Sequence, residues 1–219
     1  KRQGLGNEVV AISDTGTISA ADLKTVNGLT TGVVTLTGVT GVTGTLADIK
    51  AAYAANTAGT VTGLGNEAIS ISDLGTIVTA SDVADIEALT SGTVTVALSG
   101  TSITAATLNS LDASSTQTVN VGGVATVTGS ASAINTAYAS SGLDGLGNEA
   151  VTLSDTTLTA TTLNTVDGNT TGSVDAGTVT TLTGSITDVT ASYASSGLTG
   201  LGNEAVTLTD TTASASALN

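Results

Sequence analysis

One short sequence occurs four times in the chain and limits what the chain can fold into. The pentapeptide Gly-Leu-Gly-Asn-Glu begins at residues 4, 63, 145 and 200, and each copy precedes a short apolar run and an aspartate. Such repetition is typical of arrays in which each repeat buries its hydrophobic face only against its neighbours. We therefore interpret the chain as an array of repeats.

The spacing of the pentapeptides defines the repeat. The copies are 59, 82 and 55 residues apart, which accommodates two, three and two units of about 27 residues. We expect a single array over residues 1–219, and a fragment of a longer one, because the chain lacks an initial Met and stops within a repeat. The predicted coils are 4–32, 33–62, 63–92, 93–117, 118–144, 145–172, 173–199 and, in part, 200–219.

The composition predicts a thin and regular core. Hydrophobic residues make up 40% of the chain but aromatic residues only 1%, with three Tyr and no Phe, Trp, Met, Cys, Pro or His. Disorder is the competing interpretation of a chain rich in Gly, Thr, Ser and Ala. The strict phase of the β-branched runs argues against it, because period-2 alternation is typical of strands.

A helix start follows the strand in each coil. A Ser or Thr with an Asp three residues later has the spacing of a capping box, in which the hydroxyl accepts from a free amide of the first turn. These pairs are Ser19 and Asp22, Thr45 and Asp48, Thr79 and Asp82, and Ser185 and Asp188. An apolar anchor occupies the same place in each coil: Leu23, Ile49, Val83, Leu108, Ile134, Leu163 and Val189. The tyrosines Tyr53, Tyr138 and Tyr193 lie four residues after an anchor, and so share its helix face.

These patterns predict the fold class. A helix of two or three turns is marginal alone in water, so it must pack on the strands of its own and neighbouring coils. We expect a right-handed parallel β-solenoid with one short helix per coil, because strand–helix–strand crossovers are right-handed. An all-β right-handed β-helix, in which the helices are only irregular turns, is the alternative.

The repeated acids are the candidates for a metal site. Carboxylates at equivalent positions of successive coils could bind calcium, which prefers oxygen ligands. The candidates are Glu8, Asp14, Glu67, Asp73, Glu149, Asp155, Glu204 and Asp210. We favour a structural role, in which the glycines form a turn and the acids hydrogen-bond to the backbone. We expect no other cofactor.

Charge and residue types exclude several functions. The chain has 18 acidic and four basic residues, a net charge of −14, which disfavours nucleic acid and anionic membranes as partners. No apolar run is long enough to span a membrane. Without His or Cys, and without an acid pair distinct from the repeat, we expect no enzyme activity. Lys24 and Lys50 directly follow helix anchors, and we expect them on a solvated face.

Three segments carry a resemblance to a known group of proteins. The sequences at residues 145–157, 162–172 and 191–198 resemble the tandem repeats of giant secreted and cell-surface proteins of marine cyanobacteria. The resemblance covers the whole chain and implies an extracellular or bacterial-surface location. It supplies no catalytic residue.

These observations lead to a prediction of function. We expect a structural repeat region that acts as a rod, spacer or filament building block, with further repeats or copies of itself as partners. An adhesin, or a repeat that binds calcium or glycans, is the alternative. Ice binding by rows of threonine is a remote one.

Overall fold

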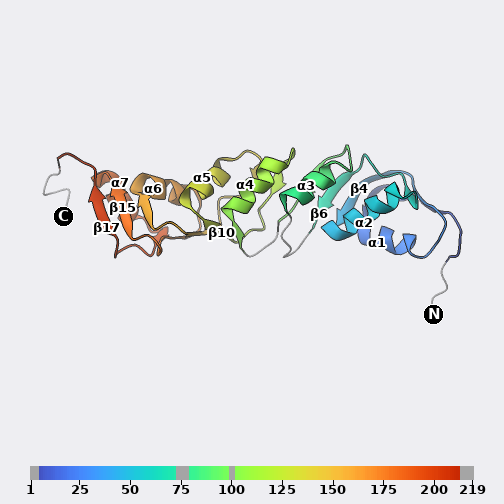
Figure 1. Cartoon of the computed structure of the whole chain (residues 1–219), viewed down its shortest axis with the longest axis horizontal. Coiled ribbons are helices and arrows are strands. Elements are labelled where there is room, and N and C mark those ends of the chain that lie inside the picture. The colour runs from blue at the N-terminus through green and yellow to red at the C-terminus, as the bar shows by residue number, and fades with distance from the viewer. Residues whose placement is uncertain (1–4, 73–78, 99–101, 213–219) are drawn as a thin grey trace. The chain divides into compact units, whose positions relative to one another are not determined.

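The computed structural model describes residues 5–72, 79–98 and 102–212, in which helices alternate with short strands (Figure 1). The helices are α1 (Ala20–Asn27), α2 (Leu46–Thr57), α3 (Ala80–Glu87), α4 (Ala105–Ser114), α5 (Ala131–Ala139), α6 (Ala160–Asn169) and α7 (Ile186–Ala194). The strands are β1 (Val10–Ile12), β2 (Gly16–Ser19), β3 (Val34–Leu36), β4 (Val39–Gly44), β5 (Val61–Thr62), β6 (Ala68–Ile71), β7 (Val94–Val96), β8 (Ile103–Thr104), β9 (Val119–Asn120), β10 (Thr126–Gly129), β11 (Leu143–Asp144), β12 (Ala150–Leu153), β13 (Thr157–Thr159), β14 (Val174–Asp175), β15 (Thr181–Gly184), β16 (Leu198–Thr199) and β17 (Ala205–Leu208). Each predicted coil from 4–32 to 173–199 contains one helix.

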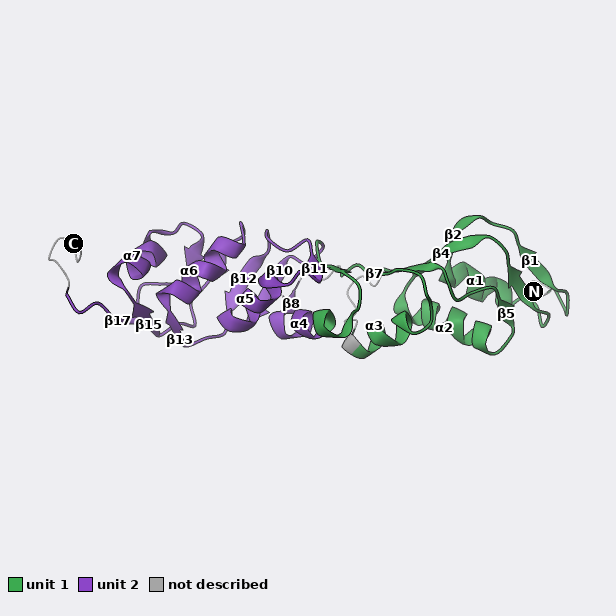
Figure 2. Ribbon diagram, turned by 90° about the horizontal axis from the view of Figure 1, so that it is seen from above, with its two compact units in different colours: residues 1–99, 111–122 green, residues 100–110, 123–219 purple. Residues whose placement is uncertain are grey.

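The chain divides into two compact units. Unit 1 comprises residues 1–99 and 111–122, and unit 2 comprises residues 100–110 and 123–219 (Figure 2). Helix α4 therefore has residues in both units.

The predicted fold class is wrong. The strands belong to several separate parallel sheets of an α/β fold, mostly of three to five strands, and not to one continuous solenoid. The seven helices of the described residues also contradict the all-β alternative. The interruption falls in the predicted coil 93–117, which lacks the pentapeptide. This coil supplies β7 to a sheet of unit 1 and β8 to a sheet of unit 2.

Unit 1 contains two parallel sheets, with strand orders β1-β3-β5 and β2-β4-β6-β7. Helices α1 and α2 contact each other and the second sheet, and α3 contacts its last strand, β7. Figure 2 shows these helices on one side of that sheet. The anchors Leu23, Ile49 and Val83 are completely buried in this layer.

Unit 2 has the same construction, with strand orders β8-β10-β12-β14-β16 and β13-β15-β17. Helix α6 contacts α5 on one side and α7 on the other, and the three helices pack on β10, β13 and β15. Leu108, Ile134 and Leu163 are completely buried, and Val189 is nearly so. The core thus consists almost entirely of Val, Ile, Leu and Ala, as the composition predicts.

The helices begin at the predicted capping residues. Ser19, Thr45, Thr79 and Ser185 are the N-caps of α1, α2, α3 and α7, and each accepts a hydrogen bond from the amide of the Asp three residues later. Among the described helices, only α3 has the reciprocal bond of a full capping box, from the Thr79 amide to the Asp82 carboxylate at 3.0 Å. The aspartates Asp48 and Asp188 accept instead from the hydroxyl of their own cap.

Candidate functional site

The pentapeptide forms a loop that is closed by its own glutamate. The second glycine has a positive φ in each described copy, and at Gly147 this angle is +132°, a conformation that side chains rarely adopt. In the copies that begin at residues 63, 145 and 200, the amide of this glycine donates to the glutamate two residues later. The distances are 2.7 Å from Gly65 to Glu67 and 2.9 Å from Gly147 to Glu149. The predicted turn with a backbone-bonded acid therefore matches the geometry of these loops.

A tyrosine of the preceding helix completes each of these loops. The hydroxyl of Tyr53 donates to Glu67 at 3.0 Å, and that of Tyr138 donates to Glu149 at 2.8 Å. Both glutamates are only 1% exposed. Such buried carboxylates require hydrogen-bond partners, which the tyrosine and the loop amide supply. Sequence reasoning missed this pairing, although Tyr138 and Tyr193 both lie eleven residues before their glutamates.

The third tyrosine pair is more open to solvent. Tyr193 donates to Glu204, which also accepts from the amides of Gly202 and Asn203. Tyr193 is 46% exposed, whereas Tyr53 is 2% exposed. Burial opposes the ionisation of Glu204, but the hydrogen bonds from Tyr193 and the loop amides outweigh it and lower the pKa of this carboxyl.

The tyrosines hold their protons more tightly than free tyrosine does. Burial is the largest cause that raises the pKa of Tyr53 and Tyr138, and the neighbouring carboxylates add to it. At Tyr193 the hydrogen bond to Glu204 is the largest cause, and the pKa rises to about 12. The phenols are thus held as hydrogen-bond donors and are unsuited to act as bases near neutral pH.

These pKa shifts predict alkaline unfolding. A raised pKa in the folded state contributes stability that is complete below the unfolded value of about 10 and is lost as the pH rises through the folded value. For Tyr193 this window runs from about 10 to about 12. We expect tyrosinate absorbance to lag behind that of free tyrosine and then to rise together with the loss of circular dichroism. Ionisation of all three tyrosines near pH 10 in the folded chain would contradict the pairing.

A second motif, which sequence reasoning missed, binds the other side of the loop. Three segments with the sequence Thr-Thr/Ser-Gly, which we call clamps, lie at residues 30–32, 90–92 and 170–172. The hydroxyl of Thr170 donates to the carbonyl of Glu149 at 2.7 Å, and the amide of Thr171 donates to that of Gly147 at 2.8 Å. Gly172 is so close that a Cβ atom would overlap the Glu149 carbonyl. The other two clamps repeat these bonds on Glu8 and Glu67.

The aspartate after the strand binds the start of the preceding helix. The carboxylate of Asp155 accepts from the Ala131 amide at 2.7 Å, and that of Asp210 accepts from the Ile186 amide at 2.7 Å. These amides are the first of α5 and α7, where the helix has unpaired donors and a positive dipole end. Asp14 is exposed, and Asp73 lies outside the described residues.

The role of Asp155 leads to a prediction. In the Asp155→Ala variant the first amide of α5 loses its acceptor, and we expect unit 2 to lose about 1 kcal/mol of unfolding free energy. The matched control is Asp14→Ala, which changes the same position of another repeat where the aspartate is exposed. Urea unfolding followed by circular dichroism measures both. Equal effects of the two substitutions would show that the cap does not stabilise α5.

The residue that follows an anchor connects one helix to the next in four of the repeats. Lys24 forms an ion pair with Asp48 at 2.9 Å, and Lys50 does so with Asp82 at 2.8 Å and with Asp85 at 3.1 Å. Lys24 lies on a solvated face, as expected, and the Lys50 side chain is partly exposed; both also form ion pairs, which the sequence reasoning did not predict. The bond to Lys50, followed by those to Thr79, lowers the pKa of Asp82 to about 2. In unit 2 the amides of Asn109 and Asn164 make the corresponding link, to backbone carbonyls of the next helix.

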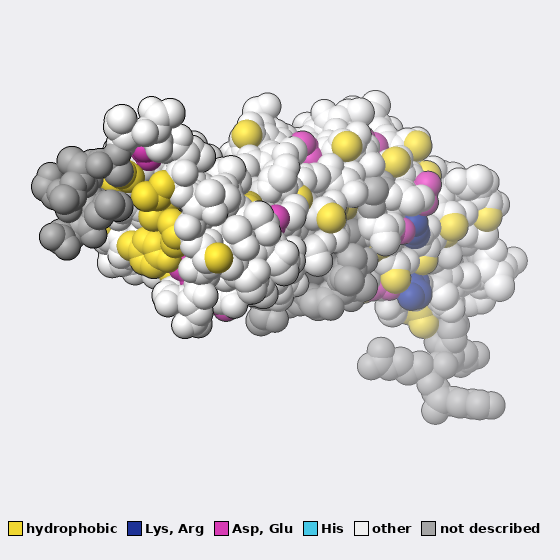
Figure 3. All heavy atoms as spheres, turned by 60° about the vertical axis from the view of Figure 1, so that its left-hand side comes forward, with side chains coloured by type: hydrophobic (Ala, Val, Ile, Leu, Met, Phe, Trp, Pro, Cys, Tyr) yellow, Lys and Arg dark blue, Asp and Glu magenta, His cyan; other side chains and the backbone are white. Residues whose placement is uncertain are grey.

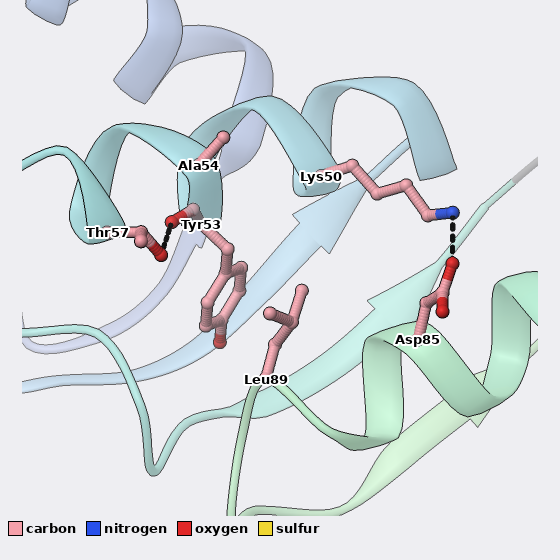
Figure 4. Close-up of a pocket in the computed structure, with 6 residues that line it drawn as sticks. All are labelled: Lys50, Tyr53, Ala54, Thr57, Asp85 and Leu89. Atoms are coloured by element: carbon pink, nitrogen blue, oxygen red, sulfur yellow. Dashed lines mark hydrogen bonds and ion pairs between the residues drawn. The ribbon is translucent and has the colours of Figure 1, made fainter.

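A small hollow lies between α2 and α3 in unit 1 (Figure 4). Its volume is about 300 Å³, and it is lined by Lys50, Tyr53, Ala54, Thr57, Asp85 and Leu89. The hydroxyl of Thr57 donates to the Tyr53 carbonyl, Lys50 pairs with Asp85, and the Tyr53 hydroxyl binds Glu67. The polar groups of the lining are thus engaged by the protein itself.

The acids do not gather into a metal site among the described residues. No group of three or more of them could hold an ion within residues 5–72, 79–98 and 102–212. Glu67, Glu149 and Glu204 bind a tyrosine and a loop amide, while Asp155 and Asp210 bind helix amides. Glu8 is exposed, and no tyrosine precedes it in the chain. One oxygen of Glu67, Oε1, is buried without a hydrogen-bond partner in the described structure.

Comparison with known proteins does not assign the chain to a family. No family model matches the chain, and neither a curated protein nor a solved structure does so. Within the described residues, no helix has the length and apolar character needed to cross a membrane.

Proposed function

We propose that the chain is a structural repeat region of a large extracellular or cell-surface protein, where it serves as a spacer or as a building block of a filament. The proposal rests on what the acidic side chains bind in the structure. Glu149, Asp155 and Asp188 each bind a neighbouring repeat or loop of the same chain. Side chains that could bind a ligand are thus committed to holding repeats together.

The links between repeats give the proposed role a physical basis. Each connection joins segments that lie roughly one repeat apart: the clamps bind the pentapeptide loops, the aspartates bind helix starts, and the residues after the anchors bind the next helix. In an array of this kind, stability comes from interfaces between neighbours. The excess of 18 acidic over four basic residues favours solubility and weakens lateral association.

The resemblance to giant surface proteins supports the proposed location. The partners would be further repeats of the same kind. An enzyme role has no support from the described side chains, since the buried acids and phenols are bonded to one another and to backbone amides.

Thermal unfolding with and without calcium tests the proposal against the calcium-binding alternative. Extracellular calcium modules bind at roughly 0.1 to 1 mM, and a ligand that binds only the folded state raises Tm with its concentration. We expect Tm to be the same within about 2 °C in millimolar calcium and in a chelator. Magnesium at equal ionic strength controls for screening of the acidic surface. A calcium-specific rise of many degrees would contradict the structural role.

A further inference from the structure

One end of unit 2 exposes residues whose counterparts in the same unit are buried. Val206 and Leu208 of β17 are 42% and 36% exposed, whereas Val151 and Leu153, at the same places in β12, are each 1% exposed. Tyr193, on the adjacent helix α7, is also exposed. Figure 3 shows hydrophobic side chains gathered at this end of unit 2.

The chain itself shows what covers the equivalent faces. Strand β12 lies between β10 and β14, and Val151 is paired with Val174. The partner segment is a clamp followed by a short strand: residues 170–172 bind the pentapeptide loop, and β14 continues the sheet. The same arrangement recurs where clamp 90–92 leads to β7 beside β6, and where clamp 30–32 leads to β3 beside β1. Three independent copies thus use one mode of recognition.

The fourth pentapeptide has no such partner among the described residues. Strand β17 pairs only with β15, on one edge, in this part of the chain. By comparison with the other copies, its other edge offers the amide of Val206, which corresponds to the Val151 amide that binds Ser173 at 2.8 Å. The carbonyls of Gly202 and Glu204 correspond to those that bind Thr171 and Thr170.

We propose that the face formed by residues 200–208 and Tyr193 is an acceptor for an extended segment of sequence Thr-Thr/Ser-Gly-x-Val, supplied by a further repeat of the same kind. The segment adds a parallel strand to β17, a mode of peptide recognition in which main-chain bonds give affinity and side-chain pockets give specificity. Its Val occupies the place beside Val206, and its first Thr covers the Tyr193–Glu204 pair. This inference deepens the proposed function and rests on it, because it specifies the part of a further repeat that binds.

The glycine of the segment provides the specificity. At Gly32, Gly92 and Gly172 alike, a Cβ atom would overlap the carbonyl group of the pentapeptide glutamate. A bound segment with any side chain at this position would have to move away from the loop and lose the bonds of its two neighbours. We therefore expect the acceptor to reject segments that match at Thr and Val but lack the glycine.

Binding of a synthetic peptide to the whole chain tests this inference. The peptide has the sequence of residues 168–177, carries a fluorescent label and is titrated with the 219-residue chain while anisotropy is recorded. We expect saturable binding, which the peptide change Gly172→Val weakens about tenfold or more. The Val206→Asp variant of the chain should lose binding. If the Val206→Asp variant does not fold, as judged by loss of far-ultraviolet circular dichroism, the test uses Val206→Thr instead, because threonine is well accommodated in a strand.

Several results would overturn the inference. These are no binding of the unchanged peptide at millimolar concentration, equal binding of both peptides, or binding that the substitution at Val206 leaves unaltered in a folded chain. Sedimentation of the chain alone tests whether a second copy of the chain binds this face instead. Self-association that excess peptide does not reverse would assign the face to that second copy and overturn the inference. None of these outcomes affects the calcium experiment, so failure here is distinguishable from failure of the proposed function.

Discussion

Replacing Gly172 with valine should destabilise unit 2 more than an ordinary surface substitution does. The new Cβ would overlap the Glu149 carbonyl, and because the nearest atoms all belong to the backbone of Glu149 and Ala150, no flexible side chain can move aside. The clamp would have to withdraw, which removes the bonds from Thr170 and Thr171. Overpacking of this kind costs about 3 kcal/mol or somewhat less, and we expect a loss near the upper end. Chemical unfolding followed by circular dichroism measures it.

A glycine four residues earlier supplies the control. Gly168 lies in α6, is exposed, and has open space where a Cβ atom would be placed. Gly168→Ala should therefore leave stability unchanged or raise it by about 1 kcal/mol, since alanine favours the helix. If Gly172→Val is as well tolerated as Gly168→Ala, the clamp does not hold the pentapeptide loop.

The second large effect concerns an anchor of the core. Leu163 of α6 is completely buried, between α6 and the sheets of unit 2. Leu163→Ala removes apolar surface and leaves a cavity, and we expect unit 2 to lose about 3 kcal/mol of unfolding free energy. Leu208→Ala removes the same group from a residue that is 36% exposed, and should cost about 1 kcal/mol or less. Similar losses for the two variants would contradict the role of the anchor.

The local structure was largely accessible from the sequence. Ser19, Thr45 and Thr79 cap helices because a hydroxyl three residues before an amide satisfies a free donor, which is a property of a few adjacent residues. The anchors could be located for the same reason, since burial of one helix face has a short period. The glutamate–backbone bond within the loop also depends on adjacent residues only.

The pairing of strands from different repeats could not be predicted in the same way. Whether strands form one sheet or several depends on how segments some 24 residues apart are aligned, and the sequence of either segment does not fix that alignment. The coil 93–117 shows the consequence, because its two strands belong to different sheets. The assumption that each coil adds one strand to a common sheet therefore failed.

The missed parts of the site also join distant residues. Tyr138 and Glu149 lie in different elements, and only the recurrence of their spacing in Tyr193 and Glu204 gives a signal. In the remaining pair, Tyr53 and Glu67 are fourteen residues apart, and this different spacing obscures the pattern. The clamps carried a signal as well, since Thr-Thr/Ser-Gly recurs after three helices. Its meaning depends on a close backbone approach that only the structure shows.

The most direct test of the account is a double-mutant cycle on Tyr138 and Glu149, because this contact uses a buried acid to join one repeat to the next loop. The unfolding free energies of the chain, Tyr138→Phe, Glu149→Gln and the double variant are compared in urea. The account predicts a coupling of about 1 kcal/mol, since the hydrogen bond from tyrosine to a buried carboxylate is lost once and not twice. Additive effects of the two substitutions, with no coupling, would contradict the claim that these acids bind the repeats together.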